Sequence, residues 1–155
     1  IWHFIGPIQS NKVKIIAKSA DWVHTLYREK IIRKLNAECE EIQKTIKACI
    51  QINISSEETK SGCSPNELID IDIAKLMKSM KNINLQGIMA LPKLTENKIE
   101  REKMMDSILK CSLDLQDFFP EAKSISLGTT SDFEDAIMNG STMVRIGESI
   151  FGKRV

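Results

Sequence analysis

Short apolar runs alternate with longer amphipathic stretches along almost the whole chain. Six of the runs are apolar nearly without interruption, as in strands that are buried on both faces. They predict strands over residues 2–5, 21–26, 48–55, 83–91, 125–127 and 142–146. Between these strands, apolar residues spaced three or four positions apart predict helices over 9–19, 27–47, 66–80, 98–119 and 132–139.

This strict alternation of strands and helices is typical of a parallel α/β sheet. Two architectures are compatible with it, a doubly wound sheet and a (β/α)8 barrel. The last two strands are each followed by a glycine-containing loop, at Gly128 and at Gly147, where N–H groups and hydroxyls can converge on one anion. Because phosphate sites recur at the loops after the last two strands of barrels, we expect a barrel with six visible strands.

Composition narrows the class of protein. The chain has 155 residues, of which 42% are hydrophobic and 28% charged, so we expect one globular domain over 1–155. The net charge of +1 and the scattered lysines do not favour nucleic acid as a partner. No apolar run reaches the ~20 residues of a membrane span, and the four cysteines lack the spacing of a metal site, so we expect a soluble, intracellular protein with free thiols.

The first residue is Ile1, and residues 2–5 already read as the inside of a strand. We therefore expect that residues are missing upstream and treat the chain as N-terminally incomplete.

Five blocks of sequence in order carry a resemblance to a known family. They are His3-Phe-Ile-Gly-Pro-Ile-Gln-Ser-Asn-Lys12, Gln51-Ile-Asn-Ile54 with Lys60-Ser-Gly62, Gly87-Ile-Met-Ala-Leu-Pro92, Ser126-Leu-Gly128, and Val144-Arg-Ile-Gly147 through Ile150-Phe-Gly152. The chain closely resembles the pyridoxal phosphate homeostasis family, also known as the YggS-like or proline-synthase co-transcribed proteins.

The resemblance implies a (β/α)8 barrel of the alanine-racemase-like type, with its first two strands missing from this chain. It further implies a cytoplasmic, non-catalytic protein that binds pyridoxal 5′-phosphate, serves vitamin B6 and amino-acid homeostasis, and is a monomer at full length. The lysine that holds the cofactor covalently in the family lies in the absent first strand, so no other lysine is nominated for that role. The alternative is an amino-acid racemase-like or sugar-phosphate enzyme on the same barrel, for which His24 and Tyr27 are the residues to test.

For the phosphate, the resemblance implies the loop residues Thr129 and Thr130, with Thr130 supplying a hydroxyl, and Gly147 and Glu148, the latter through its N–H. The competing interpretation of the first loop is a helix capped by Ser131 or Thr130.

For the pyridine ring, the resemblance places Arg145 opposite the ring nitrogen, where a fixed positive charge disfavours ring protonation. The competing interpretation is a strand-end arginine paired with a carboxylate. His3, Asn53 and Met89 lie at strand positions that would line the ring, or else belong to the barrel core.

Overall fold

Six parallel strands form the centre of the fold in a computed structural model, which describes residues 1–55, 61–69, 72–93 and 95–152. The strands pair in sequence order. They are β1 (His3–Phe4), β2 (Trp22–Leu26), β3 (Ile46–Ile52), β4 (Ile83–Ala90), β5 (Ser124–Thr129) and β6 (Met143–Arg145). All five neighbouring pairs are parallel, as the alternation of strands and helices predicts.

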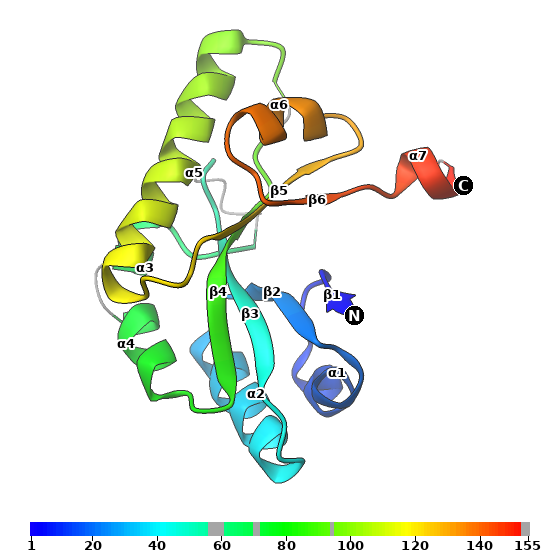
Figure 1. Cartoon of the computed structure of the whole chain (residues 1–155), viewed down its shortest axis with the longest axis vertical. Coiled ribbons are helices and arrows are strands. Elements are labelled where there is room, and N and C mark those ends of the chain that lie inside the picture. Colours follow the sequence, from blue (N-terminus) through cyan, green and yellow to red (C-terminus); the bar gives the residue numbers. More distant parts are fainter. Residues whose placement is uncertain (56–60, 70–71, 94, 153–155) are drawn as a thin grey trace.

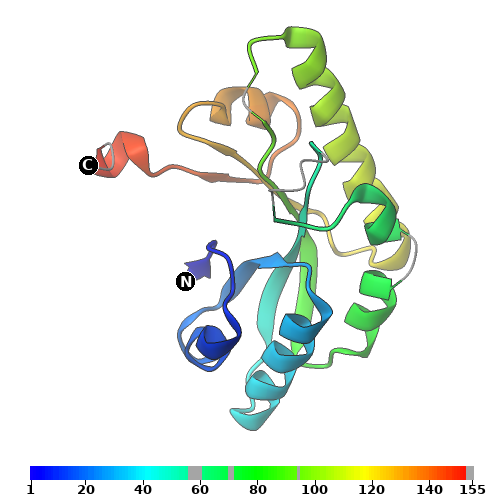
Figure 2. The same cartoon turned by 180° about the vertical axis from the view of Figure 1, so that it is seen from behind.

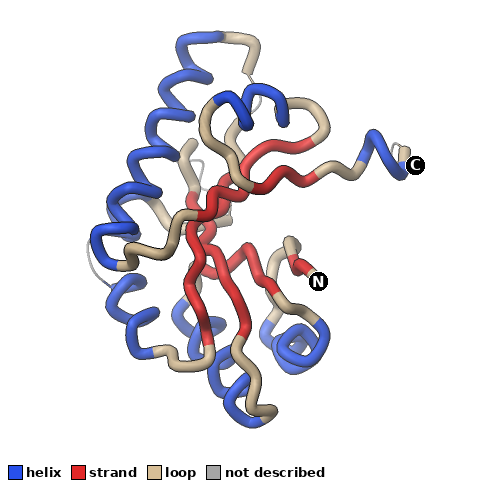
Figure 3. Tube along the Cα trace, in the orientation of Figure 1, coloured by secondary structure: helices blue, strands red, loops and turns tan. Residues whose placement is uncertain are grey.

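The helices lie along the outer side of this curved sheet, except for the last one, which lies at the C-terminal end on the opposite side, where the N-terminal end also lies (Figures 1 and 3). They are the 3-10 helix η1 (Ser10–Lys12), α1 (Val13–Ser19), α2 (Glu29–Glu41), α3 (Pro65–Ile69), α4 (Asp72–Ser79), α5 (Lys98–Phe118), α6 (Phe133–Met138) and α7 (Glu148–Phe151). The view from behind shows the same one-sided arrangement (Figure 2). A doubly wound sheet would carry helices on both faces, so the arrangement is that of part of a barrel.

The core lies between the sheet and these outer helices. Helix α2 shows how the sequence builds it, because Ile32 and Leu35 fall on one face of the helix and are both 0% exposed. They belong to one buried cluster with Val23 of β2 and Ile50 of β3. This packing holds the central strands in place and fixes which residues lie on the inner face.

The predicted helix over 27–47 is wrong at its C-terminal end. Helix α2 ends at Glu41, because Gln43 takes a positive φ of 52° and the N–H of Lys44 turns back to the carbonyl of Cys39. Ile46, predicted on the helical face, is instead the first residue of β3. An apolar residue at the end of a periodic stripe fits a buried strand equally well, and the turn at Gln43 decides between the two.

The predicted helix over 66–80 is represented by two helices, α3 and α4, with residues 70–71 between them outside the described part of the chain. Lys60 likewise lies outside the described residues. Among the described residues, no helix has the length and apolar character needed to cross a membrane.

Strands β1 and β6 are the two ends of the strand order, and they do not pair with each other. The sheet is therefore open on that side, and the inner faces of β1, β2, β5 and β6 border the gap seen in Figure 1. This inner face carries the candidate site.

Candidate functional site

A chain of hydrogen bonds links four polar side chains from four different strands on the inner face of the sheet. His3 Nδ1 lies 2.8 Å from His24 Nε2, and His24 Nδ1 lies 2.9 Å from Ser126 Oγ. Arg145 Nη1 donates to the same Ser126 Oγ at 2.6 Å. The chain therefore runs from β1 through β2 and β5 to β6, across the concave side of β3 and β4.

The Arg145 guanidinium donates hydrogen bonds to three acceptors, and its removal would leave these oxygen atoms without their donor. Besides Ser126 Oγ, its Nη1 donates to the Ser126 carbonyl at 2.7 Å and its Nη2 to the Ala90 carbonyl at 2.9 Å. Within the described residues, no carboxylate comes within ion-pair distance of Arg145, so the interpretation as a carboxylate-paired arginine finds no support there. Two of its five N–H groups have no acceptor in the part of the chain that the structure describes, and they are available to a ligand.

His24 is almost fully buried, with 2% of its surface exposed. Burial, and then the positive charges of a protonated His3 and of Arg145, lower the pKa of His24 to about 4. His24 is therefore neutral near neutral pH, and it is too weak a base to accept a proton from an amino-acid carbon efficiently.

A cavity of about 470 Å³ opens beside this chain of residues. It is lined by His3, Ile5, His24, Met143, Val144, Arg145, Ile146 and Gly147. Among the described residues, a methyl group added at Gly147 would meet no atom within 4 Å beyond the chain neighbours, so the space next to this glycine is open. The predicted site residues His3, Arg145 and Gly147 thus meet in one cavity.

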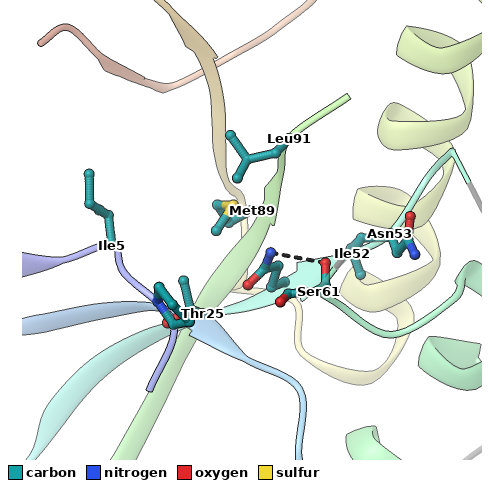
Figure 4. Close-up of a pocket in the computed structure, with 9 residues that line it drawn as sticks. Ile5, Thr25, Ile52, Asn53, Ser61, Met89 and Leu91 are labelled. Carbon is teal, nitrogen blue, oxygen red and sulfur yellow. Dashed lines mark hydrogen bonds between the residues drawn. The ribbon is translucent and has the colours of Figure 1, made fainter. Parts of the chain in front are cut away.

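Asn53 and Met89 line a neighbouring cavity of about 300 Å³, which shares Ile5 with the first one (Figure 4). Gln51 also lines this cavity, and its Nε2 donates to the Ser61 carbonyl at 3.0 Å. Met89 is 1% exposed. Both residues therefore stand beside the cavity of Arg145 and outside its lining.

Thr129 is the last residue of β5, and Thr130, which follows it, lines a different hollow. The N–H and the hydroxyl of Thr129 both donate to Asp132 Oδ1, each at 2.7 Å, so the carboxylate of Asp132 occupies the place where an anion would bind. Thr130 lines a hollow of about 340 Å³ together with Ser131, Asp132, Phe133, Glu134 and Asp135. Three carboxylates in this lining oppose a phosphate.

The interpretation of this loop as a helix cap named the wrong residue as the N-cap. Helix α6 begins after Asp132, which is its N-cap in place of Ser131 or Thr130, and its side chain turns back to Thr129. Glu148 is exposed at the start of α7, whose first turn is capped by no side chain.

Sequence reasoning did not identify Ser126 as a site residue, and it considered His24 only as a possible base. Both lie inside predicted strands. A polar side chain at an inward position of an otherwise apolar strand was the feature that could have identified them. Their pairing joins residues 102 positions apart, which periodicity within one segment does not reveal.

Comparison with known proteins gives a consistent picture. The whole chain, residues 1–155, matches the family described as alanine racemase, N-terminal domain. The pyridoxal phosphate homeostasis protein of Pasteurella multocida is 43% identical over 155 residues, and that of Haemophilus influenzae is 42% identical over 155 residues. Each match covers 99% of this chain but 66% and 65% of the relatives, so the chain spans less than two thirds of their length.

Solved structures share the fold. PipY of Synechococcus elongatus with pyridoxal phosphate bound superimposes with a TM-score of 0.85 at 23% identity, over 97% of this chain and 70% of that one. Alanine racemase of Clostridium difficile gives a TM-score of 0.80 at 17% identity, over 98% of this chain and 39% of that one. The expected alanine-racemase-like barrel, with six of its strands in this chain, is thereby confirmed, as is the resemblance to pyridoxal phosphate homeostasis proteins.

Proposed function

The chain belongs to the alanine racemase N-terminal domain family, and from this premise we propose that it binds pyridoxal 5′-phosphate without catalysing a reaction. The relatives named pyridoxal phosphate homeostasis proteins support a role in the balance of vitamin B6 and amino-acid pools. We place this role in the cytoplasm and assign it to a single domain over 1–155 that acts as a monomer in the full-length protein.

The observation that carries the proposal is the position of Arg145. Three hydrogen bonds fix its guanidinium at the wall of the cavity, with two N–H groups left over. A fixed cation with free donors suits an unprotonated ring nitrogen. The nitrogen can accept a hydrogen bond from the guanidinium, and the positive charge disfavours its protonation. The residues present therefore fit the pyridine ring of the cofactor.

The open space beside Gly147 fits the phosphate group. Gly147 precedes α7, and among the described residues the N–H groups of Glu148 and Ser149 at its start have no hydrogen-bond acceptor. We propose that these groups receive the phosphate and that Glu148 contributes through its N–H alone. Thr130 lines the acidic hollow after β5 instead, so its hydroxyl would bind the phosphate only if this loop changed its conformation.

The non-catalytic part of the proposal rests on the same side chains. Bound pyridoxal phosphate supplies an electron sink for carbanions, which is strongest when its ring nitrogen is protonated. Arg145 would hold that nitrogen unprotonated, and His24 is hydrogen-bonded to Ser126 and His3 and has a pKa of about 4. Within the described residues no lysine lines the cavity, so we propose that the residues of this chain hold the cofactor through non-covalent contacts.

The racemase alternative is tested by incubating the chain with pyridoxal 5′-phosphate and L-alanine and measuring D-alanine by chiral chromatography. We expect no D-alanine beyond that formed by free pyridoxal phosphate. D-alanine formation that disappears in His24→Gln or Tyr27→Phe would overturn the non-catalytic assignment.

A further inference from the structure

The hydrogen bonds that connect Arg145 to His24 through Ser126 have a defined direction. Arg145 can only donate, so Ser126 Oγ accepts from it. The other side-chain neighbour of this hydroxyl is His24 Nδ1, and Ser126 is 0% exposed. If Nδ1 carried a proton, two donors would converge on one oxygen and the buried hydroxyl hydrogen would lack an acceptor, which is costly. Ser126 therefore donates to an unprotonated His24 Nδ1.

The direction continues to the rim of the cavity. A neutral His24 without a proton on Nδ1 carries it on Nε2, which then donates to His3 Nδ1 at 2.8 Å. His3 in turn carries its own proton on Nε2. The His3 ring is stacked on Trp22, with centroids 5.1 Å apart and planes inclined by 10°. Among the described residues, Nε2 of His3 has no hydrogen-bond partner, and His3 lines the cavity.

We propose that Ser126 and His24 are positioning residues that fix the direction of this hydrogen-bond chain, so that His3 presents an N–H donor to the ligand in the cavity. The proposal rests on the proposed function, and it sharpens the class of ligand. With donors from both Arg145 and His3, the cavity favours an aromatic ligand that presents acceptors, such as an unprotonated ring nitrogen or a phenolate oxygen. The low pKa of His24 agrees with the neutral imidazole that the chain requires.

The direction is tested without any ligand by two-bond ¹H–¹⁵N correlation spectra of the ¹⁵N-labelled chain near neutral pH, which distinguish the two neutral tautomers of each histidine. We expect both histidines to carry the proton on Nε2. Ser126→Ala removes the donor to Nδ1 and should leave His24 as a mixture of tautomers, and the buried Ser112→Ala in α5 should change nothing. A proton on Nδ1 of His24 in the wild-type chain overturns the proposal.

The consequence for the ligand is tested by equilibrium dialysis with pyridoxal 5′-phosphate. Ser126→Ala should weaken binding about tenfold, since one hydrogen bond that orients a charged group is lost. His3→Leu should weaken it by a similar factor, whereas His3→Gln, whose amide N–H lies near the position of Nε2, should bind close to the wild type. Equal affinities for His3→Leu and the wild type overturn the donor role of His3. A wild-type chain with the expected tautomers that does not bind the cofactor overturns the proposed function instead.

Discussion

Arg145 of β6 is joined to Ala90, the last residue of β4, by a hydrogen bond of 2.9 Å from Nη2 to the carbonyl oxygen, although β5 lies between these strands. The same guanidinium binds the carbonyl and hydroxyl of Ser126 on β5. One side chain therefore fastens the last strand to the two before it while it faces the cavity. It has a structural role in addition to the one proposed toward the cofactor.

Arg145→Lys should lower the free energy of unfolding by about 1–3 kcal/mol, because an ammonium cannot reach three acceptors in this planar arrangement and leaves buried oxygens unpaired. Urea denaturation measures the change. Arg33→Lys, at an exposed pair with Glu29 in α2, is the matched control and should stay within about 0.5 kcal/mol of the wild type. Equal effects of the two substitutions would show that Arg145 does not fasten the sheet.

His24 should make the protein more stable as the pH rises from about 4 to about 6.5. Its pKa is about 4 in the folded chain and 6.5 ordinarily, so the unfolded chain binds the extra proton within this window. The contribution of His24 to the free energy of unfolding is thus fully present above its ordinary pKa. It is lost as the pH falls toward the pKa of the folded chain, by up to about 3 kcal/mol.

Denaturation curves at several pH values across this window, for the wild type and for His24→Gln, measure the effect. The chain contains two histidines, and burial also lowers the pKa of His3, so His3→Gln is the control that isolates the share of His24. A pH dependence that survives in His24→Gln but vanishes in His3→Gln would contradict the assignment.

Gly128, the second-last residue of β5, lies in a place that admits no side chain. Its φ is +95°, and an added Cβ would lie 2.6 Å from Cβ of Ala136 in α6. Gly128→Ala should therefore cost about 2–4 kcal/mol of unfolding free energy, from the left-handed conformation and from overpacking. In Gly152→Ala, φ is +81° but no atom of the described residues beyond the chain neighbours lies within 4 Å of the added Cβ, so only the conformational part remains, about 1 kcal/mol. Equal losses for both would show that the contact with Ala136 is unimportant.

The four cysteines should be unreactive in the folded protein. All are buried, and burial raises the pKa of Cys49 and of Cys63 to about 12 and that of Cys111 to about 11. Since the thiolate is the reactive form, a chromogenic disulfide reagent at mildly alkaline pH should titrate them only after denaturant is added. Rapid reaction of any cysteine in the native chain would contradict the described packing.

The sequence predicts the fold well because the strands and helices follow local periodicity. All six strands and the parallel sheet are recovered, and the errors fall where one backbone conformation decides the outcome, as at Gln43 before β3. The family resemblance names His3, Arg145 and Gly147, which the structure brings to one cavity. It does not reveal the hydrogen bond between His24 and Ser126, because these residues are far apart in the sequence. Nor does it reveal that the Thr129 N–H donates to Asp132, because this contact depends on the conformation of the turn after β5.

The most direct test of the central claim is the binding of pyridoxal 5′-phosphate to the wild-type chain and to Gly147→Val, measured by equilibrium dialysis. Among the described residues, no atom beyond the chain neighbours lies within 4 Å of a Cβ added at residue 147, so we expect the valine variant to stay folded. We predict saturable binding of one cofactor per wild-type chain, about tenfold or more weaker binding by Gly147→Val, and unchanged binding by Gly152→Ala. Absence of saturable binding to the wild type, or equal affinity of Gly147→Val, would contradict the proposed cofactor site.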